Sequence, residues 1–305
     1  MYRSQQEDRG LSRSRSRAGF AAACALILGA VGATQSASGA AAGQWIVFSA
    51  APDGLLPNQL FRMKTDGTGL QQITHGNANA TEPSFSPKGT KIVFARLGRG
   101  IYVAKPDGTA ERRLTTGAHD LFPVWSPNGK SIAFVRLYKG DYRLYLMSST
   151  GAHKHRVRNA PPSGRPSWTS NSKSLFVPRG SLDKIDARTG KPQKHYEFRM
   201  DVPQATTLSP NTKKLAFYGP RPSLPGCGEV SCLVNAVYLA NVPGGVRKFV
   251  NDGGPAGWSS DGKRLVFVYR GGIALWPVSG GAHTLLTTEK AVPAGDAPPA
   301  WQPTP

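Results

Sequence analysis

Residues 125–134 read Trp-Ser-Pro-Asn-Gly-Lys-Ser-Ile-Ala-Phe, and this stretch decides the fold. The Ser-Pro-Asn-Gly segment after Trp125 is typical of a tight turn. Proline presets φ for the first turn position, and glycine tolerates a positive φ further on. The short apolar run over 132–134 then has the character of a returning strand. The stretch therefore predicts two antiparallel strands joined by a turn.

The same pattern recurs along the chain at the spacing of a structural repeat. Its anchor positions are 85, 125, 168, 208 and 258, which lie 40, 43, 40 and 50 residues apart. Such spacing is typical of a four-stranded propeller blade. A second glycine turn, for example Asp107-Gly108, follows each third strand and indicates a further hairpin. The two ends of the chain carry complementary half-repeats, because residues 45–48 match a second strand and residues 299–303 match a first strand with its turn.

We therefore predict an all-β fold, a six-bladed β-propeller with four-stranded blades. Its ring is expected to close by pairing of the C-terminal inner strand with the N-terminal strand, which removes open sheet edges. The Trp-Ser-Pro-x-Gly-Lys-x-Ile-x-Phe units with Asp-Gly-Thr turns resemble TolB-type propeller repeats over residues 44–305. The resemblance implies a TolB-like propeller. We expect neither the additional amino-terminal domain of TolB nor a hydrolase domain, because the repeats occupy residues 44–305.

Residues 1–40 have the three-part form of a secretory signal peptide. Arginines precede a short apolar segment at residues 18–33, and residues 38–40 offer a cleavage site. The apolar segment is shorter than the ~20 residues of a spanning helix, and no later segment reaches that length. We expect Sec-type export to the periplasm, the cell envelope or the outside, with no membrane span after cleavage. The alternative is that the signal is retained as an anchor.

Cysteine usage and charge point to an exported protein with a basic surface. Export implies an oxidising setting, so Cys227 and Cys232 are predicted to form a local disulfide that stiffens the insertion at 220–232. The net charge of +20 suits an anionic partner, such as a cell-wall polymer or a lipid surface. The alternative is an ordinary soluble surface with scattered positive charge. We expect no nucleic-acid partner, because the chain has no aromatic-rich recognition motif.

The sequence offers little catalytic chemistry. No Gly-x-Ser-x-Gly elbow, phosphate-binding loop or carboxylate cluster occurs, so we predict no catalytic residue, metal or cofactor. Strand counting places the outer-to-inner connections and the second-to-third strand connections on one side of the ring. This side is predicted to form a small polar binding site at the channel mouth, from His75, Glu82, His119, Asp120, Phe122 and Arg165. Ordinary water-bound channel residues would have the same sequence pattern.

The predicted function is that of a monomeric, exported protein-interaction module, with the insertion at 220–232 as a recognition element. The alternative is a carbohydrate-binding or lyase-type propeller with a metal at the channel mouth. That alternative requires convergent histidines and carboxylates, for which His75, His119, Glu82 and Asp120 are the candidates.

Overall fold

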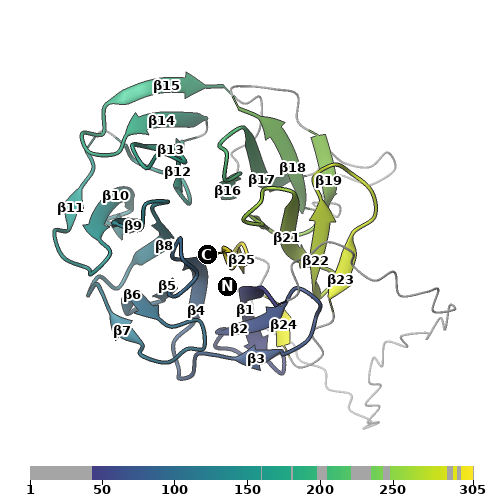
Figure 1. The fold of residues 1–305 in the computed structure, drawn as a ribbon. Helices are drawn as coiled ribbons and strands as arrows, with labels where there is room; N and C mark the ends of the chain where they lie inside the picture. Colours follow the sequence, from purple (N-terminus) through teal and green to yellow (C-terminus); the bar gives the residue numbers. More distant parts are fainter. Residues whose placement is uncertain are drawn as a thin grey trace, which may run out of the picture. The chain divides into compact units, whose positions relative to one another are not determined.

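The computed structural model describes residues 43–158, 160–179, 181–197, 205–220, 235–242, 248–286, 291–293 and 297–304, all within the unit Ala37–Pro305. These residues form 25 β-strands in six antiparallel sheets, with no helix among them. The sheets follow one another around a central axis (Figure 1); in blades 2 to 6 the strands run in chain order from the innermost to the outermost. The predicted six-bladed propeller is confirmed.

The first three blades contain the strands of the N-terminal half and the last strands of the chain. Blade 1 combines β1 (Trp45–Pro52), β2 (Gln59–Lys64), β3 (Gln71–Gln72), β24 (Ala291–Pro293) and β25 (Ala300–Trp301). Blade 2 contains β4 (Ala80–Phe85), β5 (Ile92–Arg96), β6 (Gly100–Ala104) and β7 (Arg112–Arg113). Blade 3 contains β8 (Asp120–Trp125), β9 (Ser131–Tyr138), β10 (Asp141–Ser148) and β11 (His155–Arg156).

The other three blades follow in chain order. Blade 4 contains β12 (Ser167–Trp168), β13 (Ser174–Pro178), β14 (Leu182–Asp186) and β15 (Pro192–Tyr196). Blade 5 contains β16 (Ala205–Leu208), β17 (Lys214–Pro220), β18 (Asn235–Asn241) and β19 (Lys248–Asp252). Blade 6 contains β20 (Ala256–Trp258), β21 (Arg264–Tyr269), β22 (Gly272–Pro277) and β23 (Thr284–Leu286).

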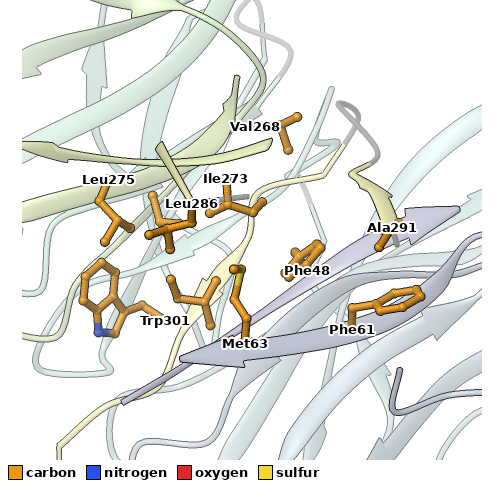
Figure 2. Packing of buried hydrophobic residues seen from close by; sticks show 12 residues of the cluster. Phe48, Phe61, Met63, Val268, Ile273, Leu275, Leu286, Ala291 and Trp301 are labelled. Carbon is orange, nitrogen blue, oxygen red and sulfur yellow. The ribbon is translucent and has the colours of Figure 1, made fainter. Parts of the chain in front are cut away.

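The hydrophobic core lies between neighbouring blades. Each second strand buries the phenylalanine of the repeat; these are Phe48, Phe94, Phe134, Phe176, Phe217 and Phe267. Because alternate residues of a strand face opposite sides of its sheet, a second strand with apolar residues on both faces packs against two neighbours at once. The cluster in Figure 2 joins blade 1 and blade 6, with Phe48 and Met63 on one side and Ile273 and Leu275 on the other.

The chain closes the ring through blade 1. Ile46 of β1 pairs with Trp301 of β25, and Ala50 pairs with Pro293 of β24, so two short strands share the innermost position. The Trp301 indole also donates a hydrogen bond of 2.9 Å to Gln44 Oε1. The predicted pairing of the C-terminal inner strand with the N-terminal strand is therefore confirmed.

The ring has two distinct ends. The Ser-Pro end carries the turns that join first to second strands and third to fourth strands. The hairpin end carries the second-to-third strand connections and the connections between blades. Hydrogen bonds join these connections to one another: the Ala80 N–H donates to the Asn58 carbonyl, and the Gly98 N–H donates to the Ala118 carbonyl. The two kinds of connection thus share one end, as the order of strands predicts.

Removal of residues 298–305 deletes β25 and should open the ring. Loss of the buried Trp301 side chain alone is expected to cost about 3–5 kcal/mol. For a domain of this size that lowers the melting temperature by about 10 °C or more. Thermal unfolding followed by circular dichroism measures the change, and a chain lacking only residues 304–305 is the control. Equal melting temperatures for the eight-residue truncation and the full chain would show that closure by β25 does not stabilise the fold.

Candidate binding cavity

The turns at the Ser-Pro end are held by their own side chains. In blade 3 the Ser126 hydroxyl accepts the Ser131 N–H at 2.9 Å and donates to Asn128 Oδ1 at 2.8 Å. Asn128 Oδ1 also accepts the Lys130 N–H at 3.0 Å, while Gly129 takes the positive φ of 71° that the turn requires. The same bonds recur in blades 4, 5 and 6 around Asn171, Asn211 and Asp261.

Neighbouring turns touch and form a collar around the axis. The Asn128 N–H of blade 3 donates to Ser172 Oγ of blade 4 at 3.0 Å. The side-chain amide of Gln302 in blade 1 donates to the Gly89 carbonyl of blade 2 at 3.1 Å. A Cβ on Gly89 would lie 2.9 Å from the Gln302 side chain and 3.0 Å from the Pro303 carbonyl, so glycine permits this approach. The collar therefore has a rigid, closely packed edge.

A cavity of about 430 Å³ lies inside the collar, on the axis. Its lining is built from equivalent positions of the repeat. The outermost ring has one residue from each blade. In blades 2 to 6 it is the residue that follows the serine or threonine of the turn, and in blade 1 it is the residue that follows Gln302. These residues are Pro87, Pro127, Ser170, Pro210, Ser260 and Pro303. The next ring comes from the last residues of the inner strands: Phe85, Trp125, Leu208, Trp258 and Trp301. Deeper positions include Ser84, Thr207 and Gly257. The wall is thus largely proline and aromatic side chains, with a few hydroxyl groups.

Arg165 also lines the cavity, directly before the inner strand of blade 4. Its side chain is 7% exposed. Nη2 donates to the Pro83 carbonyl at 3.4 Å, whereas Nη1 is buried and has no hydrogen-bond partner among the described residues. Burial lowers the pKa of the Arg165 guanidinium to about 10, and the Glu82 carboxylate opposes that shift. The group therefore remains a cation at neutral pH, and one of its donors has no hydrogen-bond partner among the described residues.

Two bulges shape the inner strands beside this cation. Glu82 and Phe122 occupy equivalent positions before a proline, and both have positive φ, 59° and 54°. The strand registers shift at the same positions, between Thr81 and Ser84 in blade 2 and at the corresponding place in blade 3. The Glu82 carboxylate accepts the Phe122 N–H and so bridges the two bulges. Left-handed backbone at a residue with a side chain is strained, and such strain is often found at binding sites.

The six residues predicted for the channel mouth are divided between two places. Glu82 and Phe122 are joined to each other, and Arg165 interacts electrostatically with Glu82. Asp120 instead pairs with Arg136 inside blade 3, with Oδ1 2.5 Å from Nε and Oδ2 2.9 Å from Nη2. His75 and His119 are exposed at the hairpin end. The His75 ring is 3.1 Å from the Gln72 side-chain amide.

The remaining predictions concern residues outside the description. Cys227 and Cys232, together with most of the insertion at 220–232, lie there, as do residues 1–40. Within the described ranges, no three or more His, Cys, Asp or Glu side chains gather as metal ligands would. The described part of the chain also has no helix that is long and apolar enough to cross a membrane.

The comparisons with known proteins agree with this geometry. Residues 27–172, which include blades 2 and 3 completely, match the family model described as the TolB beta propeller domain. The chain is a six-bladed β-propeller whose matched part resembles the TolB propeller domain. TolB from Acinetobacter baumannii is similar to it, with 20% identity and a TM-score of 0.71 over 86% of this chain and 67% of that one. A putative TolB from Agrobacterium tumefaciens has 14% identity and a TM-score of 0.59, with coverages of 85% and 94%. At these identities the likeness shows the fold. No protein with a curated description matches the chain.

Most of the lining consists of repeat positions that the sequence analysis did not single out as site residues. Trp258 ends an inner strand, and Ser260 and Pro303 belong to the adjoining turns. The signal was available, because a repeat position that precedes or follows the turn must meet its five equivalents at the centre of a closed ring. The sequence analysis expects a binding site at the hairpin end, whereas this cavity lies inside the collar at the Ser-Pro end.

The Asp120–Arg136 pair is expected to stabilise the fold and not to bind a ligand. The Asp120 side chain is fully buried. Breaking a buried pair costs about 3–5 kcal/mol, and the partial exposure of Arg136 places D120N near the lower end. The matched control is D141N, because Asp141 is 77% exposed and 3.9 Å from Arg143, and exposed pairs contribute less than about 1 kcal/mol. Urea unfolding of both variants tests this, and equal midpoints would contradict it.

Proposed function

We propose that this TolB-like propeller is an exported binding module that holds a segment of a partner protein in its central cavity. The observation that carries the proposal is the cavity of about 430 Å³, which is lined by residues of all six blades. Ligand sites are concave and mostly apolar, with a few polar groups that orient the ligand. Prolines and tryptophans supply the apolar wall here, and Arg165 with Ser84 and Thr207 supplies the polar groups.

The shape and chemistry of the cavity favour binding of an extended segment. The inner strands of the six blades all face the axis, so the wall combines residues from every blade. The lining is also held in place before a ligand arrives, because the Trp258 indole donates to the Thr207 carbonyl at 3.0 Å and the turns are fixed by their own hydrogen bonds. A pre-organised wall reduces the entropic cost of binding.

The location of the protein is part of the same proposal. The predicted Sec-type signal at residues 1–40 supports export to the periplasm, the cell envelope or the outside. At the hairpin end, exposed His75 and His119 and the insertion at 220–232 remain predictions for a second contact. Deletion of 220–233 tests that contact separately from the cavity.

Blocking the cavity tests the proposal. Ser260 occupies a collar position that is proline in four other blades, so S260W should leave the turn intact while its indole fills the cavity entrance. The control is T90W, because Thr90 is an exposed turn residue outside the lining. Ten-residue peptides selected by phage display on the wild-type protein are measured against all three proteins by isothermal titration calorimetry.

We expect peptides whose affinity falls at least tenfold, about 1.4 kcal/mol, with S260W and is unchanged with T90W. The melting temperatures of both variants should remain near that of the wild-type protein. Peptides that bind S260W and the wild-type protein equally would place binding elsewhere and refute the cavity as the site.

A further inference from the structure

Lysines surround the entrance of the cavity. Five of the six collar turns supply at least one exposed lysine immediately after or within the turn: Lys88, Lys91, Lys130, Lys173, Lys213 and Lys263. In the sequence, each of these lysines is within a few residues of a turn residue that lines the cavity; Lys130, for example, is three residues after Pro127. Charges of one sign around a concave site focus the electric field on the entrance and attract ligands of opposite charge.

The turn chemistry leaves these lysines largely without counter-charges. The side-chain oxygen at the third turn position must accept the N–H of the following lysine, and either aspartate or asparagine performs this task. In blades 3, 4 and 5 the acceptor is neutral Asn128, Asn171 or Asn211, with a distance of 3.0 Å in each. Blade 6 uses Asp261 and blade 2 carries Lys88 at this position. Asparagine therefore provides the turn geometry without the negative charge.

Carboxylates with the same local role are found farther from the axis. Asp66, Asp107 and Asp186 lie in the turns between third and fourth strands, and each accepts hydrogen bonds from the threonine two or three residues later. These bonds lower the pKa values of the three carboxyl groups, so they are ionised at neutral pH. The negative charge is thus placed at the outer part of the blades, and the collar keeps its positive charge.

The interior of the cavity also presents donors. None of its described lining residues is an aspartate or a glutamate. Two lining residues, Arg165 and Trp125, have buried nitrogen donors, Nη1 and Nε1, that lack a hydrogen-bond partner among the described residues. An unsatisfied buried donor costs about 1–3 kcal/mol, which a ligand with acceptor oxygens can recover. The cavity therefore combines a collar that carries exposed lysines with a wall in which two residues have unsatisfied buried donors.

We infer that the cavity recognises an acidic peptide segment, which the collar lysines attract and whose carboxylate binds the guanidinium of Arg165. The inference rests on the proposed function and specifies the chemistry of the bound segment. A guanidinium binds a carboxylate with paired, charge-assisted hydrogen bonds, and Nη1 of Arg165 is available for one of them. Glu82 interacts electrostatically with the same guanidinium, but Nη1 still has no hydrogen-bond partner among the described residues.

The aromatic residues favour a peptide over an acidic polysaccharide. Sugar rings typically stack on an open aromatic face, but Trp125 and Trp301 are only 8% and 6% exposed. The Trp258 indole donates to the Thr207 carbonyl and the Trp301 indole to Gln44 Oε1, so both rings are fixed in place. Proline rings and indole edges suit the apolar parts of an extended peptide.

The test uses decaglutamate with an uncharged fluorophore, and binding is measured by fluorescence anisotropy at physiological ionic strength, where the Debye length is about 8 Å. The first variant is R165Q. The second, K130Q/K173Q/K213Q, removes three collar lysines. Its matched control, K105Q/K191Q/K194Q, removes the same net charge from exposed lysines at the outer turns and outer strand. A ten-residue peptide of serine and glutamine is the uncharged probe.

We expect R165Q to weaken decaglutamate binding at least about 30-fold, as loss of a buried charge partner does. The collar variant should weaken it about tenfold, because each partly exposed charge contributes up to about 1 kcal/mol. The control variant should change it less than twofold, and the uncharged peptide should bind far more weakly. Equal losses in the two triple variants would show attraction by net charge alone and overturn the inference, as would full binding by folded R165Q.

Hydrogen exchange on the wild-type protein keeps the test decisive if R165Q does not fold. Decaglutamate should protect backbone amides of the collar turns and of residues 164–167, and protection confined to the outer strands would overturn the inference. Polygalacturonate is the polysaccharide probe. If it binds with the same dependence on Arg165 and the collar lysines while decaglutamate does not, the acidic-peptide inference is wrong. Peptides that are sensitive to S260W but insensitive to R165Q would support the proposed function and refute acidic recognition.

Discussion

The fold depends on the pairing of β25 with β1. A propeller blade cannot bury both of its faces alone, and each blade obtains its core from two neighbours. The ring therefore gains its last interface only when Trp301 pairs with Ile46 and packs into the cluster between blades 1 and 6. The same contact supplies one sixth of the collar, since Gln302 and Pro303 complete the turn of blade 1. Closure of the chain and formation of the cavity are thus one event.

The turn motif has two physical consequences at once. Locally, a hydroxyl and an Asx oxygen satisfy the backbone donors of a tight reversal. In the whole ring, equivalent turns of neighbouring blades lie side by side around the axis. A lysine that follows the turn in one blade is therefore repeated in others, and together these lysines give the collar a positive charge. A charge that is unimportant in a single blade is then a property of the whole entrance. The replacement of aspartate by asparagine at three turns is what allows the charge to accumulate.

The fold could be predicted from the sequence because the same turn and strand pattern recurs. A single short apolar run does not distinguish a strand from other structures, but five such runs after the same turn do. Five matching turns at propeller spacing, with half-repeats at both ends, allowed one arrangement, and the closing pair could be named by residue. The site was harder to predict for a physical reason. Whether Asp120 is free or paired with Arg136 depends on the register across two strands, and the positive φ values of Glu82 and Phe122 accompany register shifts in their blades. Neither bulge has a distinctive residue signature beyond the following proline. Glu82, Phe122 and Arg165 were nevertheless identified as equivalent axial positions.

The position of Gln44 and Gln302 has a practical consequence for anyone handling the protein. The Gln44 side-chain amide donates to the Gln302 carbonyl at 3.1 Å, and the next residue, Pro303, lines the cavity. A fusion partner, purification tag or immobilisation tether added after residue 305 would thus be attached beside the entrance, where it competes with incoming molecules for space. A circularly permuted chain, with residues 44 and 303 bridged and new ends placed in an outer turn such as Asp107-Gly108, would move the attachment point to the periphery. Such a permuted chain would leave the axial opening unobstructed on a sensor surface.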